Sequence, residues 1–173
     1  MNASPMKWTN VLILGSGKLA SRFAFFLARD LKIDVYVSDF QIDPTMFSGE
    51  SKIRCCKLSS ANIMALKKEV DLHAISNVII CWNSKDLFSN TLFLTMRLRS
   101  EFPKINVHVR CFDEMFADIL SRFHVQTFST SNHAFEMLRR FCVEENSAIF
   151  KRHDGSDRRR SDFTKLIDNI KLE

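Results

Sequence analysis

The chain contains few residues that interrupt or cross-link a backbone. It has four glycines and three prolines in 173 residues, and its five cysteines show no C-x-x-C spacing. An odd number of cysteines without that spacing argues against a disulfide framework and against a cysteine-rich zinc site. The cysteines fall in apolar segments, where a free thiol packs as a small hydrophobic group. We therefore expect reduced thiols and a cytoplasmic protein.

The chain also lacks long hydrophobic runs and a strong charge of one sign. No apolar run approaches the roughly 20 residues of a membrane-spanning helix, so we expect no transmembrane segment. Residues 1–8 do not have the pattern of a signal peptide. The net charge of +5 is modest, and acidic residues flank the basic cluster at 158–160, so a nucleic acid is not an expected partner. With 46% hydrophobic and 26% charged residues, the composition is that of one globular domain.

Arrangements of catalytic and metal-binding residues are missing as well. The five histidines are scattered without metal-ligand spacing to cysteines or carboxylates. There is no G-x-S-x-G nucleophile turn, and no pair of carboxylates is placed for acid–base work. We predict no metal site and no catalytic residues, and hence a protein that is not an enzyme.

One motif is well defined. Residues 11–20 read Val-Leu-Ile-Leu-Gly-Ser-Gly-Lys-Leu-Ala, and the segment 34–39 that follows ends in Asp39. Gly15 allows a tight turn, Gly17 lets the backbone approach a pyrophosphate, and Ala20 lets helix and strand pack closely. Asp39 lies 24 residues after Gly15, near the spacing of about 20 at which a carboxylate binds ribose hydroxyls. This pattern predicts a strand, a phosphate-binding turn and a helix, followed by a second strand that ends in an acid.

Short strand-like runs alternate with helical stretches along the rest of the chain. The strands are expected at residues 10–14, 34–38, 52–58, 77–82, 105–111 and 125–128. Helices are expected after Gly17 and at 61–70 (with Ser59 or Ser60 as N-cap), 85–101, 113–123 and 131–143. This order predicts an α/β protein, a three-layer Rossmann-like doubly wound parallel sheet of strand order 3-2-1-4-5-6. Its domain would cover residues 1–145, and residues 146–173 would form a polar linker with a short C-terminal helix or tail.

Beyond the first motif, the sequence resembles the RCK, KTN or TrkA-N nucleotide-binding domains of potassium-transport regulators. The resemblance rests on Cys-Trp-Asn-Ser-Lys-Asp-Leu-Phe-Ser-Asn at 81–90, Val-His-Val-Arg-Cys-Phe-Asp at 107–113, and the strand and helix segments 124–128 and 134–138. In that family a helix bearing an Asn follows the fourth strand, and the fifth strand typically ends in an Arg. Arg110 matches that arginine, whereas Asn83 stands where the family usually has a Thr. The resemblance implies a regulatory domain, a homodimer, and a potassium transporter as partner.

The predicted ligand is NAD(H) or an adenine nucleotide (AMP, ADP or ATP). A 2′-phosphate beside Asp39 would meet like-charge repulsion, which disfavours NADP. Lys18 could pair with a phosphate, Phe40 could lie against an adenine ring, and Asn83 and Ser84 follow the fourth strand at the carboxyl edge of the sheet. Arg110 could contact the ligand or form a structural ion pair, for which Asp113 is a candidate partner. The predicted binding residues are Gly15, Ser16, Gly17, Lys18, Leu19, Asp39, Phe40, Asn83, Ser84 and Arg110.

These observations favour a non-catalytic regulatory module in which ligand binding changes how subunits pack. The segments 85–101 and 113–123 are the expected contact surface of the homodimer. Two alternatives remain at this point: a degenerate Rossmann scaffold that acts by protein–protein contacts, and a small NAD(P)H-dependent oxidoreductase.

Overall fold

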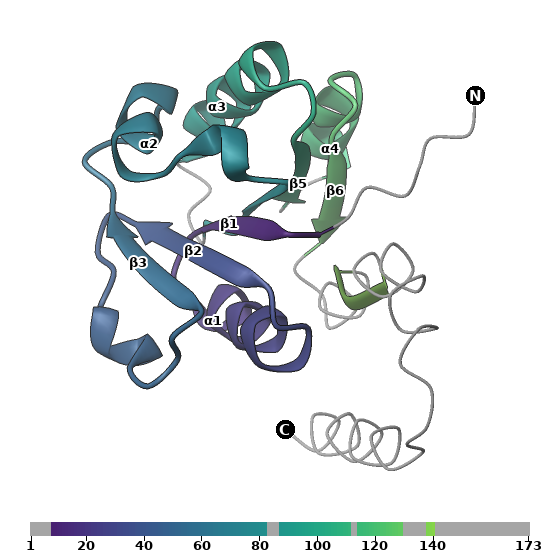
Figure 1. Ribbon diagram of the computed structural model, residues 1–173. Helices are drawn as coiled ribbons and strands as arrows, with labels where there is room; N and C mark the ends of the chain where they lie inside the picture. The colour runs from purple at the N-terminus through teal and green to yellow at the C-terminus, as the bar shows by residue number, and fades with distance from the viewer. Residues whose placement is uncertain (1–7, 83–86, 112–113, 130–137, 141–173) are drawn as a thin grey trace.

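A six-stranded parallel sheet forms the centre of the molecule (Figure 1). The computed structural model describes residues 8–82, 87–111, 114–129 and 138–140. In sheet order the strands are β3 (Ile53–Lys57), β2 (Asp34–Asp39), β1 (Asn10–Leu14), β4 (Asn77–Ile80), β5 (Asn106–Cys111) and β6 (Gln126–Ser129). All five strand pairs are parallel. The predicted order 3-2-1-4-5-6 of a doubly wound sheet is therefore confirmed.

Helices cover both faces of this sheet. Helix α1 (Lys18–Phe25) and its continuation as a π-helical turn, η1 (Phe26–Asp30), lie on one face. Helices α2 (Ile63–Glu69), α3 (Phe88–Glu101) and α4 (Glu114–Ser121) lie on the other (Figure 1). Two short 3₁₀ turns, η2 (Pro44–Phe47) and η3 (Leu72–Ala74), complete the connections. The result is the predicted three-layer arrangement.

Alternate residues of the central strands belong to two separate hydrophobic clusters, one on each face of the sheet. Val11 and Ile13 of β1 point toward the α1 side, where they join Phe23 and Leu27. The alternate residues of β1 point toward the side of α2, α3 and α4. The central strands are thus buried on both faces, which explains their nearly unbroken apolar sequences.

Because glycine is scarce, other residues adopt left-handed backbone at two helix ends. Lys32 has φ 57° just after η1, and His124 has φ 54° just after α4. At the first of these ends the Ile33 N–H donates to the Leu27 carbonyl at 3.0 Å, the closing bond of a helix C-cap that usually contains glycine. The sequence has no glycine at either of these positions, so it gave no signal of where the two helices end.

The N-cap of α2 differs from the prediction. Asn62, rather than Ser59 or Ser60, caps this helix by accepting a hydrogen bond from the Ala65 N–H at 2.9 Å. The Ser60 hydroxyl instead accepts from the Asn62 side-chain amide at 2.8 Å, so it orients the cap. Both residue types are good caps, and the helix begins two residues later than expected.

Candidate functional site

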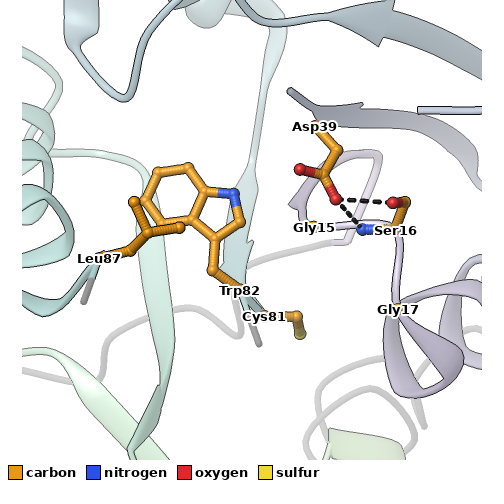
Figure 2. A pocket seen from close by; sticks show the side chains of 7 residues that line it. All are labelled: Gly15, Ser16, Gly17, Asp39, Cys81, Trp82 and Leu87. Carbon is orange, nitrogen blue, oxygen red and sulfur yellow. Dashed lines mark hydrogen bonds between the residues drawn. The ribbon is translucent and has the colours of Figure 1, made fainter. Parts of the chain in front are cut away.

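A pocket opens at the carboxyl ends of β1, β2 and β4. Strand β1 pairs with β2 on one side and β4 on the other, so the chain connections leave it in opposite directions. Open α/β sheets bind their ligands at such a switch point. The cavity has a volume of about 340 Å³, and Figure 2 shows the seven residues that line it: Gly15, Ser16, Gly17, Asp39, Cys81, Trp82 and Leu87.

The glycine turn is held tightly between the neighbouring strands. The Gly15 N–H donates to the Ser38 carbonyl at 2.8 Å, and the Cys81 N–H donates to the Leu14 carbonyl at 2.7 Å. Gly15 has φ +120°, and a Cβ added there would lie 3.0 Å from the carbonyl carbon and oxygen of Cys81. Position 15 therefore requires glycine for both its conformation and its space.

Gly17 has a different role. It is the N-cap of α1 with φ −67° and ψ 171°, an extended conformation open to any residue. Its backbone conformation therefore does not require glycine, and the close approach of a phosphate stays the prediction for this position.

Asp39 connects the end of β2 to this turn. Its Oδ2 accepts hydrogen bonds from the Ser16 N–H at 2.7 Å and from the Ser16 hydroxyl at 2.6 Å. Its Oδ1 accepts from the Phe40 N–H at 2.7 Å. A carboxylate offers about four acceptor positions. The chain itself fills three of them, so the carboxylate is fixed in orientation and retains about one position for a ligand hydroxyl.

The N-cap residues of two helices line this pocket, and no side chain of the described residues caps either helix. Gly17 and Leu87, the N-cap residues of α1 and α3, offer no side-chain oxygen to the first amides of their helices, and both line the cavity. Uncapped amides and the positive end of the helix dipole favour an anion at such a position. Lys18, exposed in the first turn of α1, forms no ion pair with the described residues. These groups together provide a positive side to the pocket, opposite in sign to Asp39.

Trp82 forms another wall of the pocket. Trp82 stacks on Phe40 with ring centroids 5.7 Å apart and an angle of 25° between planes. Trp82 is 4% exposed, and its indole Nε1 has no hydrogen-bond partner among the described residues. Neither Trp82 nor its pocket neighbours Cys81 and Leu87 was predicted as a binding residue. The rule that placed Asn83 at the carboxyl edge of β4 applies equally to residues 81 and 82, so the sequence held the information.

Cys81, which also lines the pocket, has a buried thiol. Burial raises the pKa of Cys81 to about 12, and the nearby Arg110 guanidinium opposes that rise only in part. Arg110 is half-buried on β5 and pairs in register with Phe128 of β6. It thus lies near the floor of the site, and its suggested partner Asp113 lies outside the described residues.

Apart from Arg110, the predicted binding residues divide into three groups. Four of them line the cavity: Gly15, Ser16, Gly17 and Asp39. Others lie around it, with Phe40 against Trp82, Lys18 exposed on α1, and Leu19 partly buried against the hydrophobic cluster on the α1 side. Asn83 and Ser84 lie outside the described residues.

Two features are absent from the described part of the chain. No group of three or more His, Cys, Asp or Glu side chains there is placed to hold a metal ion. No helix in those residues is both long enough and apolar enough to cross a membrane.

Comparison with solved structures identifies similar folds. The crystal structure of the GsuK RCK domain aligns with 82% of this chain and 30% of its own, at 20% identity and a TM-score of 0.57. The TrkA-N domain of the inner membrane protein YbaL from Escherichia coli aligns over 79% of this chain and 95% of its own, at 15% identity and a TM-score of 0.57. In fold, the chain is similar to RCK and TrkA-N domains.

A Rossmann-fold NAD(P)-binding family protein from Shigella flexneri is similar as well. It covers 70% of this chain and 66% of its own length, at 16% identity and a TM-score of 0.55. No known family model and no curated protein sequence matches the chain. The fold implied by the resemblance is thus confirmed, and the argument about the ligand rests on the site itself.

Proposed function

We propose that this chain is a non-catalytic regulatory module that binds NAD(H) or an adenine nucleotide in the pocket at the switch point of its sheet. The observation that supports this most is the contact between Asp39 and Ser16, which fixes a carboxylate beside a glycine turn and an uncapped helix N-terminus. A ribose beside a phosphate needs this pairing of an acceptor with anion-binding amides.

The charge of Asp39 favours ligands with free ribose hydroxyls. A ribose hydroxyl can donate to the remaining acceptor position of the carboxylate, whereas a 2′-phosphate would bring a second negative charge to it. The described residues place no arginine in this pocket. NADP is therefore disfavoured relative to NAD, AMP, ADP or ATP.

The proposed regulatory step is a change in subunit packing within a homodimer. Phe88 of α3 stacks on Phe116 of α4 with ring centroids 3.7 Å apart, so the first turns of these two helices are in contact. Because α3 begins at Leu87 in the pocket wall, a ligand there can favour one position of α3 and hence one packing. The similarity to the GsuK RCK domain makes a potassium transporter the proposed partner.

The test is calorimetric binding of NAD, NADH, NADPH, AMP, ADP and ATP to the full chain, with light scattering to follow its oligomeric state. We expect micromolar binding of at least one nucleotide other than NADPH, and a change in mass or shape on binding. Asp39→Ala should weaken that affinity about tenfold or more, because it removes a charged acceptor. Asp34→Ala is the matched control, since it removes an exposed carboxylate at the other end of β2 whose surface ion pair with Lys52 adds little stability.

A second candidate function is a scaffold that no longer binds nucleotide and acts by protein contacts. It is favoured by the three hydrogen bonds from the chain to Asp39, which satisfy this carboxylate when the pocket holds no ligand. If a cooperatively folded protein binds none of the six nucleotides, the nucleotide-binding regulatory module is refuted and the scaffold is favoured. Steady oxidation of NADH with a carbonyl or quinone acceptor would instead indicate an oxidoreductase.

A further inference from the structure

Trp82 presents a buried hydrogen-bond donor at the pocket. It directly follows Cys81 at the carboxyl end of β4, is 4% exposed, and contributes to the cavity wall. Its Nε1 has no acceptor among the described residues. A buried indole N–H without an acceptor costs free energy, and Trp residues in protein interiors usually satisfy this group.

The orientation of the ring shows where an acceptor would have to lie. In Figure 2 the nitrogen-bearing edge of the indole is turned toward the glycine turn and the Asp39 carboxylate, across the cavity. The opposite edge of the ring lies near Leu87. Stacking on Phe40, at 5.7 Å and 25°, holds the plane of the indole in this direction.

We propose that Trp82 and Asp39 together bind the ribose hydroxyls of the nucleotide, with the indole N–H as donor and the carboxylate as acceptor. This assignment rests on the proposed function and adds a specificity residue to it. A hydroxyl group both donates and accepts a hydrogen bond. A ribose 2′,3′-diol between the two side chains therefore satisfies the last acceptor position of Asp39 and the free donor of Trp82 at once.

The two hydrogen bonds have opposite directions, which makes the site selective. An aliphatic group in place of the hydroxyls would leave the indole N–H and the carboxylate without partners. Leaving buried polar groups unpaired lowers affinity more than the loss of a contact alone. The site is thus expected to distinguish a ribonucleotide from a nucleotide that lacks both hydroxyls.

The experiment compares AMP with 2′,3′-dideoxy-AMP on the wild-type chain and on Trp82→Phe. Phenylalanine keeps an aromatic ring against Phe40 but has no N–H. We expect Trp82→Phe to weaken AMP binding about fivefold, the value of one neutral hydrogen bond, and to leave the affinity for 2′,3′-dideoxy-AMP unchanged. NAD is titrated in parallel as the dinucleotide probe. Trp8→Phe is the matched control, because Trp8 is equally buried but packs on Phe23 and His108 away from the pocket.

Nuclear magnetic resonance gives a second measurement that does not depend on affinity. The chain has two tryptophans, so a ¹⁵N-correlated spectrum shows two indole N–H signals, and Trp82→Phe assigns them. Saturating AMP should shift the Trp82 signal downfield and slow its exchange with solvent, while the Trp8 signal serves as the internal reference.

The possible outcomes separate this inference from the proposed function. Equal weakening of AMP and 2′,3′-dideoxy-AMP by Trp82→Phe would mean that the indole acts by shape, and would overturn the ribose assignment alone. An unchanged AMP affinity in Trp82→Phe would overturn it as well. Failure of the wild-type chain to bind AMP or NAD would refute the nucleotide site and this inference together. Urea unfolding of each variant confirms that the compared proteins are folded.

Discussion

His108 should make the fold sensitive to mild acid. Its ring is 1% exposed on β5, stacks against Trp8 with centroids 5.3 Å apart, and lies 3.3 Å through Nε2 from Asn77 Oδ1. Since an amide oxygen can only accept, Nε2 carries the proton of the neutral ring. Burial lowers the pKa of His108 from 6.5 to about 4.

The sign and size of the effect follow from this shift. Between pH 6.5 and about 4, the unfolded chain binds a proton at His108 that the folded chain does not, so stability falls as the pH falls. The contribution of the neutral His108 to folding stability is fully present above pH 6.5 and is lost progressively below that pH. At pH 5.0 the lost stability is about 2 kcal/mol relative to pH 7.5, within a limit of about 3 kcal/mol for the whole shift.

Urea unfolding at pH 7.5, 6.0 and 5.0 measures this loss. His108→Phe keeps a ring against Trp8 and cannot titrate, although it removes the partner of Asn77 and costs about 1–3 kcal/mol at every pH. We expect the wild type to lose about 2 kcal/mol more than His108→Phe between pH 7.5 and 5.0. His73→Gln, a change at an exposed histidine, is the control that should follow the wild type. Parallel curves for wild type and His108→Phe would refute a buried neutral His108.

Two further predictions concern backbone at positive φ. Gly15→Ala should cost about 3 kcal/mol in urea unfolding and abolish nucleotide binding, because the new Cβ would lie 3.0 Å from Cys81 backbone atoms. Gly49→Ala is the control, with φ +86° but no atom within 4 Å of the new Cβ; it should cost only about 1 kcal/mol, and equal losses at both glycines would show that contact with Cys81 is unimportant. Lys32→Gly should raise the free energy of unfolding by up to about 1 kcal/mol by relieving left-handed backbone at φ 57°. Lys68→Gly, within α2, should lower it by about the same amount, and a destabilising Lys32→Gly would contradict the strain argument.

The strand order could be predicted because strand-like and helical patterns alternate clearly along the sequence. Unbroken apolar runs such as that of β4 alternate with helical segments, and a right-handed crossover between parallel strands leaves few possible topologies. Element boundaries were less certain. The end of α1 through η1 could not be predicted, since Lys32 rather than a glycine takes the left-handed position there.

The candidate site was predictable to the extent that it depends on local geometry. Gly15 and Asp39 were identified from their spacing, and both line the pocket. Leu19 illustrates the limit of such reasoning, because its place in the motif suggested contact with a ligand while its side chain packs toward the hydrophobic cluster on the α1 side. Trp82 was missed because the fourth strand was expected to run to residue 82, whereas β4 ends at Ile80 and leaves Trp82 at the carboxyl edge of the sheet.

The sequence by itself determined the α/β class, the strand order and the glycine turn, because hydrophobic periodicity and backbone freedom are properties of neighbouring residues. The tertiary structure decided how the ends of β1, β2 and β4 are combined into one pocket. Only the packed chain brings Ser16 to the Asp39 carboxylate across 23 residues, and places Trp82, stacked on Phe40, with its ring nitrogen toward that carboxylate. Those contacts join segments distant in sequence, and their geometry is fixed by close packing of the whole sheet rather than by local preference.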